Sequence, residues 1–336
     1  MALTGFDLEQ LLDSETGGTN LVPFVEQGYT GTTDYRIRQL SYSSLLTLHS
    51  CPRKFQLYRL RTTHRAEEDE KSTITFSFGH VIGTAIQAIL SGSTLDEVIL
   101  GIFLEWHAPF LSVDEKSHKS IWYAIFAIQK FAALREAGLL NDYELVYYND
   151  RPACELSFSV IFPDGFRLRG FVDAVLRHIP TGRIVVLEVK TTNSASLDPA
   201  KYKNSAQAIG YSIVLDNIFP DLSDYQVLYF IYQTKDKEYS LVPFTKTYLQ
   251  RALWIRELLL DIETIKMYEE AGIYPMRGES CFSFSRPCEY FNTCELGTAY
   301  LTKPCTAEEE DKADYQITLT LQDLLETQFK KLEAPI

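Results

Sequence analysis

Apolar runs and alternating patterns divide the middle of the chain into strands and helices. Strands are predicted over residues 154–162, 166–177 and 183–190, and the run 184–187 is apolar on both faces, as in a strand covered on both sides. Further strands are predicted over 225–233 and 238–243, and helices over 78–92, 94–106, 117–137, 203–217, 246–271 and 321–332. The order helix, three strands, helix, strand predicts an α/β core with a mixed sheet flanked by helices.

Two shorter helices are expected nearer the N-terminus. Ser41 or Ser43 is a candidate N-cap for a helix through residues 45–48, and Pro52 suits the first turn of a second helix. We therefore expect an N-terminal arm over 1–40, a principal domain over 41–295 with its core at about 78–245, and an acidic C-terminal tail and helix over 296–336.

One predicted hairpin carries the most informative charges of the sequence. If the chain turns at Pro180-Thr181, the numbers of paired residues sum to 361, and Asp173 then faces Glu188. The Cβ atoms of such a pair are roughly 5 Å apart, so the two carboxylates repel each other and lose hydration on an apolar hairpin. A divalent metal such as Mg²⁺ between them would offset that cost, with Lys190 beside it on the same face. The alternative is a surface hairpin with three solvated charges.

Composition narrows the class of protein. Of the 336 residues, 46% are hydrophobic and 13% aromatic, enough for a packed globular core. No apolar run approaches the roughly 20 residues of a membrane span, and the first residues lack the basic start and apolar stretch of a secretory signal. We therefore expect a cytoplasmic protein with no membrane partner, in which the six cysteines are thiols or metal ligands rather than disulfides.

The charge is distributed unevenly along the chain. The formal net charge is −13, yet residues 36–65 contain seven Lys or Arg and no acid. Such a basic stretch can form an electrostatic track for phosphates, with Arg53, Lys54, Arg59 and Arg61 as candidate DNA contacts. The alternative is a solvated helix face.

Asp173 and Glu188-Val189-Lys190 form the pattern D-x14-E-x-K on the predicted hairpin, after Gly170. Downstream, Gln207 and Tyr211 have the i, i+4 spacing of one helix face, as in Q-x-x-x-Y, and upstream stands SYSSLLTLHSCPRKF. This set resembles the RecB-type PD-(D/E)XK nucleases, and in particular their iron–sulfur exonuclease branch. The resemblance implies a restriction-endonuclease-like fold with helical N-terminal and cysteine-bearing C-terminal elaborations.

The resemblance also implies roles for the motif residues. Asp173, Glu188 and the backbone carbonyl of Val189 would hold Mg²⁺ or Mn²⁺ at the scissile phosphate, where the metal activates a water. Lys190 would orient that water or stabilise the developing oxyanion. The pair downstream, Gln207 and Tyr211, would steady the phosphate backbone or the lysine.

One position departs from the family pattern. The resemblance places a metal-binding His at the end of a G-x-x-x-H element, but here Gly83-Thr84-Ala85-Ile86 is followed by Gln87. Gln87 would ligate the metal through its carbonyl oxygen, or the site would rely on two carboxylates. His80, two turns earlier on the helix, is the other candidate.

The cysteines form a second constellation. Cys281-x6-Cys288-x5-Cys294 lies far downstream of Cys51, and the set is similar to the four ligands of a [4Fe–4S] cluster in the iron–sulfur nucleases. The family spacing would place the first of the three at Ser285 instead. Zinc and unligated thiols are the alternatives. A cluster would join the basic N-terminal helices to the C-terminal loop.

The expected function is therefore a metal-dependent DNA nuclease, an exonuclease that acts on single-stranded or processed duplex ends in recombination, repair or phage DNA metabolism. No G-x-x-x-x-G-K-[ST] motif occurs in the sequence, which favours a stand-alone nuclease or one that works with a helicase or recombination protein as partner. The alternatives are a partner-dependent nuclease of the CRISPR-adaptation type, a catalytically weak or inactive DNA-binding scaffold, and a zinc-stabilised interaction module.

Overall fold

The computed structural model describes residues 38–59, 65–194, 196–219, 225–271, 273–283, 286–292, 294 and 315–333. The chain divides into a cysteine unit, formed by residues 1–68 and 258–314, and a sheet unit, formed by residues 69–257 and 315–336. Nearly all of the predicted arm over 1–40, and residues 296–314 of the predicted tail, lie outside the described residues.

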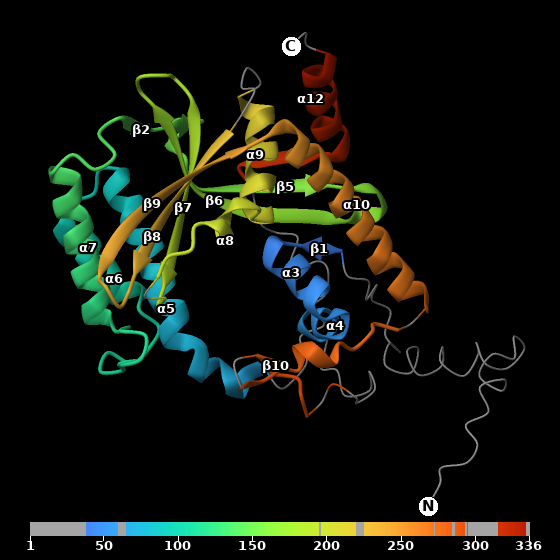
Figure 1. Ribbon diagram of the computed structural model, residues 1–336, viewed down its shortest axis with the longest axis horizontal. Coiled ribbons are helices and arrows are strands. Elements are labelled where there is room, and N and C mark those ends of the chain that lie inside the picture. Colours follow the sequence, from blue (N-terminus) through green and yellow to red (C-terminus); the bar gives the residue numbers. More distant parts are fainter. Residues whose placement is uncertain are drawn as a thin grey trace, which may run out of the picture. The chain divides into compact units, whose positions relative to one another are not determined.

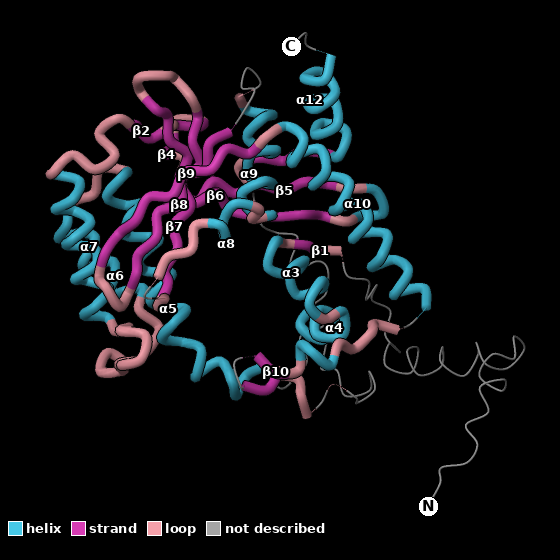
Figure 2. The backbone as a smooth tube through the Cα atoms, in the orientation of Figure 1, coloured by secondary structure: helices cyan, strands magenta, loops and turns pink. Residues whose placement is uncertain are grey.

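The sheet unit is built around a mixed sheet with the strand order β12-β5-β6-β7-β8-β9, and β2 pairs with β6 (Figures 1 and 2). These strands are β2 (Tyr143–Leu145), β5 (Cys154–Ile161), β6 (Arg167–His178), β7 (Ile184–Thr192), β8 (Tyr225–Gln233), β9 (Glu238–Lys246) and β12 (Ile317–Thr320). Along the strand order, neighbours are antiparallel except for two parallel pairs, β7 with β8 and β12 with β5. The predicted fold class, a mixed sheet flanked by helices, is confirmed.

The hairpin of β6 and β7 has the predicted register. Ala174 pairs with Leu187 and Val175 with Val186, so the paired numbers sum to 361. The chain turns directly after His178, whose N–H bonds to the carbonyl of Arg183 at 2.8 Å. The turn at Pro180-Thr181 thus fixed which side chains of the two strands share a face.

Helices cover both faces of β7. The helices of the sheet unit are the C-terminal part of α5 (Arg65–Leu90), α6 (Leu95–Glu105), α7 (Ile121–Glu136), α8 (Ala200–Lys203), α9 (Ala206–Ile218), the first turns of α10 (Tyr248–Ala271) and α12 (Leu321–Glu333). Val185 and Leu187 pack into a core with α5, α6 and α7. Glu188 and Lys190 point to the other face, where α9 contributes a hydrogen bond to Lys190.

Local signals explain where the helices begin and end. Thr94 caps α6 in a capping box with Glu97, and Ser120 caps α7. After α5, Gly92 adopts φ +98°, a conformation that glycine reaches without steric cost. None of the described helices combines the length and apolar character needed to cross a membrane.

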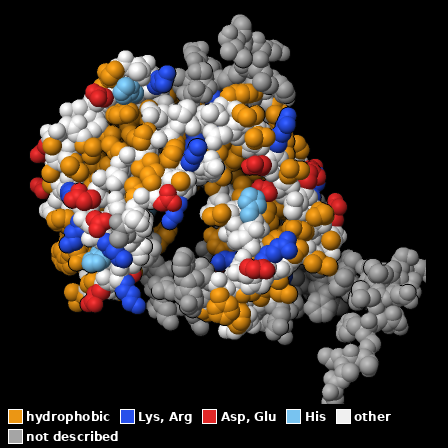
Figure 3. All heavy atoms as spheres, in the orientation of Figure 1, with side chains coloured by type: hydrophobic (Ala, Val, Ile, Leu, Met, Phe, Trp, Pro, Cys, Tyr) orange, Lys and Arg blue, Asp and Glu red, His pale blue; other side chains and the backbone are white. Residues whose placement is uncertain are grey.

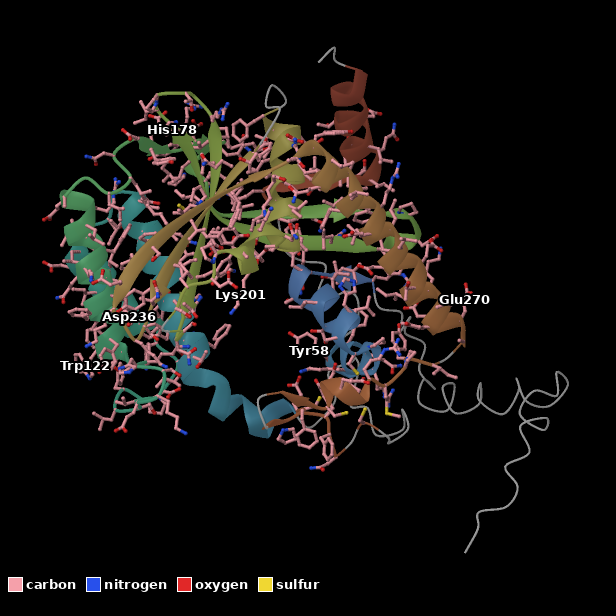
Figure 4. All side chains as sticks on the ribbon, viewed as in Figure 1. Tyr58, Trp122, His178, Lys201, Asp236 and Glu270 are labelled. Carbon is pink, nitrogen blue, oxygen red and sulfur yellow. The ribbon has the colours of Figure 1, made fainter. Side chains whose placement is uncertain are left out.

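The outer surface of the sheet unit is mixed. Acidic, basic and hydrophobic side chains alternate over the visible face (Figure 3). Several large apolar side chains of α6 and α7 are exposed, among them Leu104 and Trp122, and Trp122 lies on the outer side of its helix (Figure 4).

The cysteine unit combines short elements from both ends of the sequence. They are β1 (Gln39–Leu40), α3 (Tyr42–Ser50), α4 (Pro52–Arg59), the later turns of α10, a 3-10 turn (Gly278–Ser280), β10 (Phe282–Ser283) and β11 (Arg286–Pro287). Ser41 is the N-cap of α3, in a capping box with Ser44. Of the two predicted N-cap candidates, Ser41 and Ser43, the first is therefore confirmed. An ion pair of Arg38 with Glu269 at 3.0 Å and a hydrogen bond between His49 and Asp261 at 2.8 Å link the N-terminal residues to α10.

Some elements differ from the prediction. The helix predicted to begin near residue 78 begins at Arg65, and the one predicted over 203–217 is the pair α8 and α9, interrupted at Asn204-Ser205. Strand β12 was not predicted. Its partner β5 lies about 160 residues earlier, and a four-residue strand has too little pattern of its own to be recognised.

Candidate active site

The predicted acid pair lies where β6 and β7 separate. Regular pairing ends at Ala174 and Leu187, and Asp173 and Glu188 occupy the next positions of the same register. Past this point the Asp173 side chain bridges the two strands, because its Oδ2 accepts a hydrogen bond from the backbone N–H of Val189 at 2.8 Å. The carbonyl of Val189 belongs to the same stretch of β7. The structure thus brings Asp173, Glu188, Val189 and Lys190 together.

Glu188 is a buried carboxylate with an unfilled bonding capacity. Its side chain is 1% exposed, and Oε1 lies 2.5 Å from Lys190 Nζ. Its Oε2 accepts no hydrogen bond from the described residues. Burial raises the pKa of Glu188, against the effect of Lys190, and the charge of Glu155 raises it further. An ionised carboxylate in this position therefore needs more positive charge than Lys190 alone supplies.

Asp173 is also a buried carboxylate whose ionised form is destabilised by its surroundings. Burial and then the neighbouring Glu188 raise its pKa well above the usual range, while Lys190 and the Val189 N–H oppose the rise. Carboxylate oxygens are the ligands that Mg²⁺ and Mn²⁺ prefer. A buried acid pair with an unbonded oxygen fits a divalent cation. Within the described residues, no three His, Cys, Asp or Glu side chains already converge as a complete set of metal ligands.

The next two predicted residues extend the site from Lys190 into α9. Lys190 Nζ donates to Gln207 Oε1 at 3.3 Å, and Gln207 Nε2 donates to the Tyr211 hydroxyl at 2.6 Å. Tyr211 is buried, and its ring meets Phe158 edge-on at 6.0 Å. This chain of hydrogen bonds orients the lysine from the helix side. The pKa of Lys190 is raised: burial lowers it, but the pairing with Glu188 outweighs that effect.

Gln87 lies on α5, buried at 5% exposure, and its Nε2 donates to Glu155 Oε1 at 2.9 Å. Sequence reasoning missed Glu155, which is exposed at the start of β5. The sequence offers one partial signal, since Glu155 is the only charged residue of the predicted strand 154–162, but that signal does not place it beside Asp173. The other candidate for the missing histidine, His80, contacts Glu105 at 3.5 Å and stacks near His107.

A comparison of the sequence with known protein families matches residues 39–295 to the PD-(D/E)XK nuclease superfamily. The chain belongs to this superfamily. No curated protein matches the sequence. Among solved structures, the chain is similar to the crystal structure of a putative exonuclease from Eubacterium rectale, at 14% identity and TM-score 0.48, over 82% of this chain and 94% of that one. It is also similar to the crystal structure of SSO0001, at 15% identity and TM-score 0.30, over 76% and 87%.

Because it belongs to this superfamily, the chain has a nuclease domain. Nucleases of the superfamily generally use divalent metals, which agrees with the acid pair described above. The geometry places the D-x14-E-x-K pattern of this nuclease on two adjacent strands, with all three charged side chains at one point of the sheet.

The four cysteines expected to bind a cluster line one cavity of the nuclease's cysteine unit. Cys51, Cys281, Cys288 and Cys294 all border a space of about 420 Å³. Burial raises the pKa of Cys294; Arg53 opposes this, and the other three thiols add to the rise. Cys288 is held by a 2.7 Å bond from its N–H to the carbonyl of Cys281.

The candidate DNA-binding residues have other contacts in the same unit. Arg53 Nε donates to the carbonyl of Cys294 at 3.1 Å, and its Nη1 bonds to Gln56. Lys54 pairs with Glu289 at 3.2 Å. Both side chains thus tie α4 to the cysteine loop. Arg59 is the last residue of α4, and Arg61 lies outside the described residues.

Proposed function

We propose that this nuclease hydrolyses phosphodiester bonds of DNA with Mg²⁺ or Mn²⁺, and that it is an exonuclease acting on DNA ends. The observation that carries the proposal is the buried Glu188 carboxylate beside Asp173 and Lys190, with an oxygen that no described residue satisfies. Such a group is costly in a stable fold unless a ligand completes it. A divalent cation supplies the missing positive charge, and a phosphate of the DNA can then bind to that cation.

The residues of the site have distinct roles in this proposal. Asp173, Glu188 and the carbonyl of Val189 would hold the cation, which when bound lowers the pKa of a coordinated water and offsets the charge of the phosphate. Lys190, 2.5 Å from Glu188, presents an ammonium that orients the attacking water or stabilises the developing oxyanion. Gln207, held by Tyr211, fixes the lysine in that position.

The test is cleavage of end-labelled single- and double-stranded DNA with Mg²⁺ or Mn²⁺, using protein purified without oxygen. Lys190→Ala should lower the rate of cleavage by a factor of about 10² or more and leave DNA binding unchanged. Lys116→Ala, an exposed lysine in a loop, is the matched control and should cleave as wild type does. Covalently closed circular DNA should resist cleavage. Cutting of the circle would make the enzyme an endonuclease instead.

We also propose that Cys51, Cys281, Cys288 and Cys294 hold a [4Fe–4S] cluster, with zinc as the alternative. The proposal is supported by the single cavity that all four thiols border. The cluster would join α3 and α4 to the loop after α10 and act structurally. Iron and zinc analysis of protein purified without oxygen distinguishes the two metals, and zinc without iron would overturn the cluster.

The biological setting follows from the same proposal. If the nuclease acts on single-stranded or processed ends, a helicase or a recombination protein would supply them, in the cytoplasm. No cleavage by protein with intact iron and DNA binding would favour a partner-dependent nuclease or a non-catalytic scaffold. The substitution of Gln87 for the expected histidine is the observation that favours the scaffold.

A further inference from the structure

The site where β6 and β7 separate carries more negative than positive charge. Asp173 and Glu188 oppose one ammonium, that of Lys190. A third carboxylate, that of Glu155, lies on the strand next to Asp173, in the register position opposite it. When all are ionised, three carboxylates and one lysine leave two negative charges, the charge that one divalent cation neutralises.

Glu155 lies in the same row of the sheet as the acid pair. In the pairing of β5 with β6, Cys154 faces Ala174 and Leu156 faces Val172, so Glu155 takes the position opposite Asp173. Asp173 in turn takes the position opposite Glu188 in the register of β6 with β7. Three neighbouring strands thus each place one acid at the same level of the sheet.

The backbone and α5 give Glu155 a specific setting. Its φ is +45°, in the left-handed region that non-glycine residues rarely adopt. Next to it, Cys154 contacts Ser91 and the carbonyl of Gln87, which holds the start of β5 against α5. The Glu155 carboxylate then accepts a hydrogen bond from the buried Gln87 side chain at 2.9 Å. An ionised carboxylate only accepts hydrogen bonds, so the amide NH₂ of Gln87 must face it.

We propose that Glu155 is the third carboxylate ligand of the divalent cation, and that Gln87 is the positioning residue that holds it. The inference rests on the proposed metal-dependent function. It gives Gln87 a different role from the one expected from the sequence: the glutamine orients a ligand through its NH₂ group. The unbonded, buried oxygen of Glu188 is the independent sign that a ligand belongs at this level of the sheet.

The experiment measures Mn²⁺ binding directly, without DNA, from the electron paramagnetic resonance signal of free Mn²⁺ during a titration. Glu155→Gln keeps the size of the side chain and removes its charge, and should raise the Kd at least about tenfold. Gln87→Met removes the hydrogen-bond donor, and should raise the Kd by less. Glu144→Gln is the control, because Glu144 is an exposed acid paired with Arg177 at 3.3 Å on β2. Its Kd should equal that of wild type.

Asp173→Asn separates the failure of this inference from the failure of the proposed function. If Asp173→Asn abolishes Mn²⁺ binding and Glu155→Gln leaves the Kd unchanged, the metal site stands and Glu155 is not a ligand. A lower melting temperature of Glu155→Gln in EDTA with an unchanged Kd would likewise make its role structural. If Asp173→Asn binds Mn²⁺ as wild type does, the proposed metal site itself is wrong.

Discussion

Replacing Asp173 by asparagine should stabilise the metal-free protein. Asparagine keeps an oxygen that can accept the hydrogen bond from the Val189 N–H, but it carries no charge. Burial and the neighbouring Glu188 make the ionised aspartate costly, as the raised pKa of Asp173 shows. Each unit by which folding raises a carboxyl pKa costs about 1.4 kcal/mol at neutral pH. We therefore expect the free energy of unfolding in EDTA to increase.

The size of this effect depends on pH and on metal. The folded pKa of Asp173 lies above the unfolded value of about 3.9, so the cost is absent below that pH, grows between the unfolded and the folded pKa, and is complete above the folded pKa. The advantage of the variant should disappear towards pH 4. With Mn²⁺ at a hundred times the Kd, wild type gains about 2.7 kcal/mol that the variant does not, so the difference in stability should shift by that amount in favour of wild type.

Thermal unfolding at several pH values, in EDTA and in MnCl₂, tests this reasoning. One kcal/mol corresponds to about 2–4 °C in a unit of this size. Glu144→Gln should follow wild type under all conditions. An Asp173→Asn variant that melts below wild type in EDTA at pH 7.5 would refute the argument, because Asp173 would then stabilise the fold without a metal.

Three further outcomes are expected. Tyr211→Phe removes the hydroxyl that holds Gln207, so single-turnover cleavage should slow by roughly tenfold with KM unchanged, and a rate equal to wild type would rule out the orienting role. The pairing with Glu188 raises the pKa of Lys190, so cleavage should not decline between pH 7 and 9 through loss of the lysine's proton, and a decline that Lys190→Arg removes would contradict this. Cys288→Ser should lose iron, visible absorption and thermal stability together, and retained colour with unchanged melting would count against the cluster.

The hairpin and the larger elements could be predicted because their signals are local. A turn of few residues at Pro180-Thr181 fixes the register of β6 with β7, and with it the position of Asp173 opposite Glu188. Strand β8 (Tyr225–Gln233) has the predicted bounds, because apolar and aromatic residues occupy most of its length, as in a strand covered on both faces.

Glu155 could not be placed from the sequence. Its position depends on the register of β5 with β6, on a left-handed backbone conformation, and on a hydrogen bond to Gln87, which lies 68 residues away. None of these three features can be predicted from the residues around position 155. The early start of α5 was missed for a different reason, because residues 65–72 are mostly charged or polar and carry no apolar periodicity.

The parallel pairing of β12 with β5 sets an order of events during synthesis. The edge of β5 that receives Ile317–Thr320 leaves the ribosome about 160 residues before its partner exists. Translation proceeds at about 5–20 residues per second, so roughly 8 to 30 s pass before β12 can pair with the backbone groups of that edge. During this time the strand that carries Glu155 is open to pairing with another chain. The β5 edge of the nuclease sheet is therefore covered only after β12 has been made.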